Sequence, residues 1–223
     1  MRRPPAVAVI VVVAIVVAGA LALTACSAGR RSNSAAPVPT TTLARTVSGT
    51  VDLRRLIVTT APAGYDVLPS PPYGAVDMAR LLAEFSDAPS DDRVILQDTR
   101  FKRGYTRGWQ RESPAGYFGV FVFEFADEEG ARSARDKFAD QNVTRKDAVR
   151  FAVDSIADAV GESYTGPAGE GDGDGEARGP LRVHLVTFVR GPRLYQVGGQ
   201  FADATAPPDE TVAFAEAEAR IAA

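Results

Sequence analysis

Residues 181–201, LRVHLVTFVRGPRLYQVGGQF, contain two apolar runs, Leu181–Val189 and Leu194–Phe201, which are separated by Gly191-Pro192-Arg193. Two β-prone runs around a short turn with glycine and proline are typical of a β-hairpin. A turn of this length requires antiparallel strands, because parallel strands need a long crossover connection. This stretch therefore predicts an antiparallel sheet.

Outward from the hairpin, four more segments have the pattern of β-strands, with β-branched and aromatic residues or alternating apolar and polar side chains. They are residues 53–60, 101–109, 117–125 and 149–153. Helical spacing of apolar side chains occurs in residues 76–85, in residues 127–140, which we expect Asp127 to cap, and in residues 208–223. The glycine-rich acidic residues 161–180 are expected to lack regular structure. The pattern predicts an α+β fold, an antiparallel sheet with about three helices packed on one face, as a single compact domain.

The first 26 residues have the layout of an export signal. Arg2 and Arg3 precede an uncharged apolar run from Ala6 to Leu23, which is typical of a secretory signal. An uncleaved transmembrane helix is the alternative, because 18 residues are long enough to span a bilayer. Leu23-Thr24-Ala25-Cys26 resembles the lipobox of bacterial lipoproteins. This resemblance implies cleavage before Cys26, a diacylglycerol on its thiol, and an acyl chain such as palmitate on the new amino terminus.

Three parts of the chain follow from this interpretation: residues 1–25 as the lipoprotein signal peptide, residues 26–47 as a flexible tether, and residues 48–223 as the globular domain. Cys26 is the only cysteine, so the mature domain is expected to fold through its core alone, without a disulfide. The tether has a reach of roughly 25 Å. Export by the general and by the twin-arginine route both stay open, because Arg2 and Arg3 are adjacent. The expected location is the cell envelope, at the extracytoplasmic face of the cell membrane.

The charge of the chain argues against nucleic acid as a partner. The sequence has 25 basic and 28 acidic side chains, and residues 1–25 hold two of the basic ones and no acid, so the mature chain has a formal charge of −5. Binding to phosphate backbones needs concentrated positive charge. We expect contact with the membrane through the lipid on Cys26, and an envelope protein, lipid or glycan of unknown identity as partner.

A second resemblance rests on the order of Pro62-Ala63-Gly64-Tyr65, a short helix, residues 101–109 (FKRGYTRGW) and residues 120–131 (VFVFEFADEEGA). This order is similar to exported actinobacterial lipoproteins, some of which are described as carrying PsbP/Mog1-like α+β domains. The similarity covers about residues 50–223. It implies the fold class and supplies no catalytic residues.

Hydrolase chemistry has one candidate set of residues. Gly161-Glu162-Ser163-Tyr164-Thr165 departs from the nucleophile elbow Gly-x-Ser-x-Gly at its last position. The single histidine, His184, lies downstream with Asp172 and Asp174 between, which is the order of such a triad. No apolar strand leads into Ser163, and His184 fits a strand residue at a sheet surface. A small envelope hydrolase using Ser163 and His184 is therefore the less favoured alternative, and we expect no catalytic residues.

Metal sites are nearly excluded by composition, and no cofactor is expected. One histidine and one lipidated cysteine leave too few ligands for a zinc or iron site of the usual kind. Four residues match offsets one, three, five and six of a calcium-binding EF-hand loop: Glu170, Asp172, Asp174 and Gly175. The twelfth position is Leu181 in place of the bidentate glutamate. A solvated acidic loop is the favoured interpretation.

The aromatic strand is the remaining candidate for a ligand site. Tyr105, Arg107 and Trp109 are predicted to project from one face of the strand, alongside Phe101 and Arg103. Such residues can bind a lipid, glycan or protein in a shallow groove, or pack under a helix with arginine stems over the rings. Packing is favoured, with a carrier of a lipid or cell-wall precursor as the alternative. The leading hypothesis is a lipid-anchored binding or scaffolding domain without catalysis.

Overall fold

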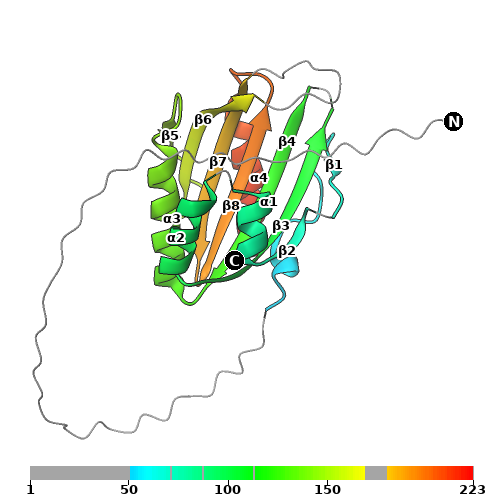
Figure 1. The fold of residues 1–223 in the computed structure, drawn as a ribbon. Helices are drawn as coiled ribbons and strands as arrows, with labels where there is room; N and C mark the ends of the chain where they lie inside the picture. The colour runs from blue at the N-terminus through cyan, green and yellow to red at the C-terminus, as the bar shows by residue number, and fades with distance from the viewer. Residues whose placement is uncertain (1–50, 71, 87, 113, 169–179, 223) are drawn as a thin grey trace, which may run out of the picture. The chain divides into compact units, whose positions relative to one another are not determined.

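The computed structural model describes residues 51–222, except residues 71, 87, 113 and 169–179. Its strands form one antiparallel sheet in the order β1-β3-β4-β8-β7-β6-β5, with β2 paired to β3 beside this path (Figure 1). The strands are β1 (Asp66–Val67), β2 (Gly74–Val76), β3 (Phe101–Arg111), β4 (Gly116–Phe125), β5 (Val149–Phe151), β6 (Val160–Ala168), β7 (Pro180–Arg190) and β8 (Arg193–Phe201). The predicted antiparallel sheet and the α+β fold class are confirmed.

The hairpin that predicted the sheet lies near its middle. β7 and β8 pair from Arg182 opposite Phe201 to Arg190 opposite Arg193, which leaves Gly191-Pro192 as the turn. Gly191 has a φ of +53°, a conformation that glycine adopts without the strain a Cβ would cause. The hairpin is therefore confirmed with the turn where the sequence predicts it.

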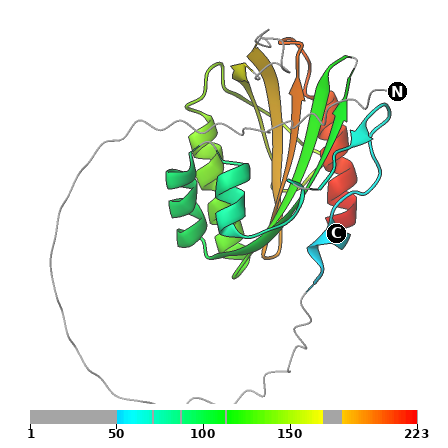
Figure 2. The same cartoon turned by 45° about the vertical axis from the view of Figure 1, so that its right-hand side comes forward.

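Helices cover both faces of the sheet (Figure 2). One face is covered by α1 (Met78–Glu84), α2 (Pro89–Asp98) and α3 (Glu128–Asn142), and the other by α4 (Asp209–Ala222) with the 3-10 helix η1 (Leu53–Leu56). The expectation that all helices pack on one face is wrong for α4. The physical reason is that the central strands are apolar on both faces, so each face has to be shielded from water.

Strand β4 shows this two-sided burial most clearly. Phe121 and Phe123 point into the first core, under α1, α2 and α3, whereas Val120 and Val122 point into the second core, under α4 and η1. All four side chains are buried, with at most 5 % of their surface exposed. The sheet is thus the middle of three layers.

Two segments differ from the sequence prediction. Residues 53–60, expected as a strand, begin with η1, because the Asp52 side chain accepts a hydrogen bond from the Arg54 N–H at 3.1 Å and Leu53 and Ile57 bury on one side. Residues 161–168, expected without regular structure, belong to β6. This strand forms despite its glycines because β5 and β7 supply hydrogen-bonding partners on its two sides.

An irregularity between Phe101 and Arg103 of β3 changes the face to which the following side chains point. Phe101 lies opposite Phe125 and packs in the first core, whereas Tyr105 and Trp109 pack in the second core. The expectation that Phe101 projects together with Tyr105 and Trp109 is therefore wrong. A bulge adds one residue to a strand and so shifts its side-chain parity.

Several predictions concern segments that the structure leaves undescribed. The signal peptide of residues 1–25, the lipidated Cys26 and the tether of residues 26–47 all lie outside the described residues. Within the described part of the chain, no helix is long and apolar enough to cross a membrane.

Trp109 is expected to be a principal support of the second core. Its side chain is fully buried, and its ring meets that of Phe214 on α4 edge-on, with centroids 5.0 Å apart. We expect Trp109→Ala to lower the free energy of unfolding by about 3–5 kcal/mol, because it leaves a cavity between β3 and α4. Urea denaturation followed by circular dichroism measures this loss.

The matched control is Val94→Ala on α2, whose side chain is 55 % exposed. It should change the free energy of unfolding by no more than about 0.5 kcal/mol. A similarly small loss for Trp109→Ala would contradict the packing of α4 on β3.

Candidate functional site

Ser163 of β6 and His184 of β7 lie opposite each other in the sheet and share a hydrogen bond. Ser163 Oγ is 2.5 Å from His184 Nδ1, and His184 Nε2 is 2.9 Å from the carbonyl oxygen of Ala206. A carbonyl oxygen only accepts, so Nε2 carries the proton and the Ser163 hydroxyl donates to Nδ1. This is the kind of hydrogen bond by which a histidine base activates a serine nucleophile.

The pair is nevertheless enclosed in the domain. The exposed fractions are 3 % for Ser163 and 1 % for His184, and the rings of Phe151 and Phe201 lie beside the imidazole. His184 thus lies in a strand, as expected, but it is buried and does not lie at the sheet surface. Burial lowers the pKa of His184, because it disfavours the charged imidazolium. A neutral histidine that bonds both ring nitrogens is typical of a satisfied polar group in a core.

The backbone at Ser163 also differs from that of a nucleophile elbow. Ser163 lies inside a strand, opposite Val149 of β5 and His184 of β7, so the peptide N–H groups there serve the sheet. An elbow is a sharp turn that leaves N–H groups available to a developing oxyanion. The place of the triad carboxylate is taken by the Ala206 carbonyl, and Asp172 and Asp174 lie outside the described residues.

The three candidate ligand-binding residues of β3 have different surroundings. Trp109 is buried against Phe214, so its ring faces protein rather than solvent. Tyr105 is half-buried against the same core. Arg107 is also half-buried, with its guanidinium carbon 5.9 Å from the centroid of the Trp109 ring. This arrangement matches the packing alternative, in which an arginine stem covers an aromatic side chain.

Two hollows border the helices on the first face. A partly open cavity of about 40 Å³ lies under α1, α2 and α3, and it has room for a few water molecules but not for an acyl chain. Its lining residues are Leu81, Phe85, Ser86, Asp92, Leu96, Phe121, Phe123, Phe138, Asn142 and Gln196.

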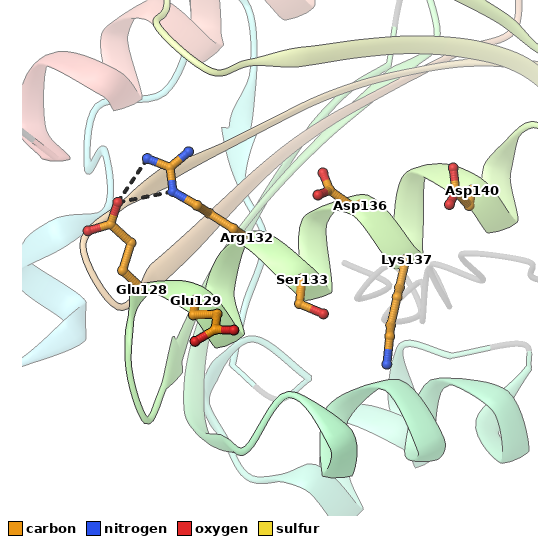
Figure 3. A pocket seen from close by; sticks show the side chains of 7 residues that line it. All are labelled: Glu128, Glu129, Arg132, Ser133, Asp136, Lys137 and Asp140. Atoms are coloured by element: carbon orange, nitrogen blue, oxygen red, sulfur yellow. Dashed lines mark hydrogen bonds and ion pairs between the residues drawn. The ribbon is translucent and has the colours of Figure 1, made fainter.

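The second hollow, of about 590 Å³, lies along the outer face of α3 and is lined by Glu128, Glu129, Arg132, Ser133, Asp136, Lys137 and Asp140 (Figure 3). Arg132 pairs with Glu128 and Asp158 at 2.8 Å, and Lys137 pairs with Asp98 at 3.0 Å. Exposed pairs of this kind contribute little to stability. They are typical of a solvated helix face.

A third hollow, of about 450 Å³, lies on the other side of the sheet, where η1 meets β3. It is lined by Asp52, Arg54, Arg55, Thr59 and Arg107. Arg107, which the sequence grouped with two aromatic side chains, is thus also grouped with two exposed arginines of η1.

No group of three or more potential metal ligands occurs among the described residues. The four residues that resemble part of a calcium loop, Glu170, Asp172, Asp174 and Gly175, lie outside that part of the chain. The described residues therefore do not bear on the calcium alternative.

Three carboxylate side chains are buried in the described part of the chain, those of Asp92, Glu162 and Glu218, and sequence reasoning singled out none of them as a buried group. Glu218 of α4 is fully buried, and its Oε2 accepts the Val58 N–H at 2.8 Å. Glu162 of β6 is 4 % exposed and accepts from Asn142 Nδ2 at 3.0 Å. Burial raises the pKa of both glutamates, that of Glu218 to about 7. A signal existed for Glu218, since it follows Phe214 and Ala215 at helical spacing.

Comparisons with known proteins add little to this geometry. No protein-family model matches the chain, and no curated protein matches it. Among solved structures, it is similar to the extracellular domain of PknH from Mycobacterium tuberculosis, with a TM-score of 0.38 and 9 % identity over 57 % of this chain and 69 % of that chain. A likeness of this size supports no inference about function.

Glu218 gives the stability of the domain a measurable pH dependence. Its pKa is about 7 in the folded state against 4.5 for a free carboxyl. The folded state therefore favours the protonated carboxyl, and the stability that this form contributes is fully present below pH 4.5 and is lost as the pH rises through 7. We expect Glu218→Gln to remove this loss, because the amide oxygen still accepts the Val58 N–H. Relative to wild type, its free energy of unfolding should rise by up to about 3 kcal/mol between pH 4.5 and pH 8.

Urea denaturation across this pH range measures the difference. The control is Glu129→Gln on the exposed face of α3, which should follow the wild type at every pH. Parallel curves for wild type and Glu218→Gln would refute the assigned burial of this carboxylate.

Proposed function

We propose that this chain is an exported lipoprotein, held at the extracytoplasmic face of the cell membrane by a lipid on Cys26, whose domain binds or scaffolds a partner without catalysis. One observation carries the non-catalytic part. The nucleophile and base that stand together, Ser163 and His184, are 3 % and 1 % exposed. A substrate has to reach both groups for acyl transfer, and here the strands and aromatic rings around them occupy that space.

The filled interior supports a scaffold more than a lipid carrier. Carriers of small molecules enclose their ligand in cavities of about 300–1,000 Å³. The cavity under α1, α2 and α3 has about 40 Å³, and Trp109 on the other face is packed against α4. Recognition of an envelope protein, lipid or glycan therefore falls to the outer surface of the domain.

Anchoring through Cys26 is supported by the sequence alone. The apolar run of residues 6–23, the lipobox and the absence of any other cysteine all favour a lipoprotein, as does the resemblance to exported actinobacterial lipoproteins with PsbP/Mog1-like domains. Two or three acyl chains give stable attachment, where a single chain binds only marginally.

Replacement of the lipidated cysteine tests the anchor. Cys26→Ser should release the protein from membranes or leave a precursor about 25 residues longer than the mature chain, because neither lipidation nor signal cleavage can proceed. Membrane fractionation with immunoblotting measures both outcomes, and Ser27→Ala serves as the matched control. Unchanged processing and membrane retention in Cys26→Ser would mean that the apolar run is an uncleaved helix.

A hydrolase is the second candidate function, favoured by the 2.5 Å hydrogen bond between Ser163 and His184. We expect the purified mature chain to leave ester, peptide and glycoside substrates intact, because the serine is covered. Ser163→Ala should then have no activity to abolish. Hydrolysis that disappears in Ser163→Ala and persists in Ser155→Ala would show that the protein is a hydrolase and would refute the non-catalytic scaffold.

A further inference from the structure

We infer that Arg54, Arg55 and Arg107, hereafter the basic patch, bind the phosphate groups of anionic phospholipids, so that the domain docks onto the membrane that holds its anchor. This inference rests on the proposed lipidation of Cys26 for its location. It goes beyond the anchor, because it gives the folded domain its own contact with the bilayer and a fixed orientation on it.

The geometry of the basic patch suits a phosphate group. Its three arginines line a hollow of about 450 Å³ together with Asp52 and Thr59. Arg54 and Arg55 are exposed and Arg107 is half-buried. A guanidinium presents several N–H donors in one plane, which matches two oxygens of a phosphate.

The charges of the basic patch are only weakly neutralised by the domain. Arg55 lies 3.8 Å from Asp52, with side chains that are 85 % and 58 % exposed, and such a pair is weak in water. Among the residues that the structure describes, Arg54 and Arg107 form no ion pair with an acidic side chain. Most of the positive charge of the basic patch is therefore not neutralised by described acidic side chains and can attract an anionic ligand.

The distribution of charge along the chain points the same way. Residues 26–55 contain five arginines and one aspartate, a formal charge of +4, whereas residues 56–223 contain 18 basic and 27 acidic side chains, a formal charge of −9. A negative membrane surface attracts the first part and repels the second. The domain should consequently turn η1 toward the lipid headgroups and its acidic body away from them.

The point where the tether joins the domain favours a phospholipid over other anions. The described chain begins at Val51, three residues before Arg54, and Val51 lies 25 positions after Cys26. A flexible tether, as the sequence predicts for this segment, would hold the basic patch within roughly 30 Å of the anchored lipid. The local concentration of headgroups is then on the order of millimolar or higher, so a weak site is sufficient.

Vesicle binding tests the basic patch without help from the anchor. The chain from residue 26 to residue 223, carrying Cys26→Ser so that no lipid is attached, is sedimented with phosphatidylcholine vesicles and with vesicles that also contain phosphatidylglycerol. We expect binding only to the second kind, and a decline as salt is raised, because the contact is electrostatic. Equal binding to both kinds would overturn the inference.

Charge variants localise the contact. Arg54→Gln/Arg55→Gln should weaken binding about 25-fold, at about fivefold for each arginine. Asp52→Asn should strengthen it about fivefold, since it removes a repelling charge while its side-chain oxygen still accepts the Arg54 N–H. The control Arg93→Gln/Lys146→Gln removes the same charge from two exposed residues on α2 and beside β5, and it should leave affinity within about twofold of the wild type.

Equal losses in the patch variant and the control would show that overall charge, not the basic patch, governs binding. Binding of an anionic polymer such as polyphosphate by the basic patch, with no binding to vesicles, would also overturn the inference. Because the assay uses an unlipidated chain, its outcome is independent of the fractionation of Cys26→Ser.

Discussion

Strands β4, β8 and β7 have to be shielded from water on both faces, and this requirement governs the rest of the domain. Phe121 and Phe123 lie on one face of β4 and Val120 and Val122 on the other. Exposure of either face would cost free energy roughly in proportion to its apolar area. Three helices meet this need on one side, while α4 and η1 meet it on the other. Polar groups caught between the layers, such as His184, then have to find partners inside the protein.

Local patterns were sufficient to predict most of the sheet. Alternation and β-branched residues identified β3, β4 and the β7–β8 hairpin, because these signals are contained in each segment. β6 was missed, since a strand with several glycines forms only when neighbouring strands supply its hydrogen bonds. The bulge after Phe101 has no signal in the sequence either, yet it decides which core each aromatic side chain of β3 enters.

The candidate site shows the same limit. Residue type and order were sufficient to nominate Ser163 and His184, but their hydrogen bond depends on the register between β6 and β7. The burial of both side chains favours a polar link inside the sheet over an activated nucleophile. Glu218 was overlooked for the opposite reason: a carboxylate on a helix is usually solvated, and only the packing of α4 against the segment around Val58 makes it an interior group.

The hydrogen bond from Val58 to Glu218 joins residues 160 positions apart, close to the two ends of the domain. Contacts of such long range delay folding, because the intervening chain has to be ordered first. The second core cannot close until α4, the last helix that the structure describes, has been synthesised. In a chain that emerges from its amino terminus, the first core can therefore form before the second, which closes only when nearly all of the domain has emerged.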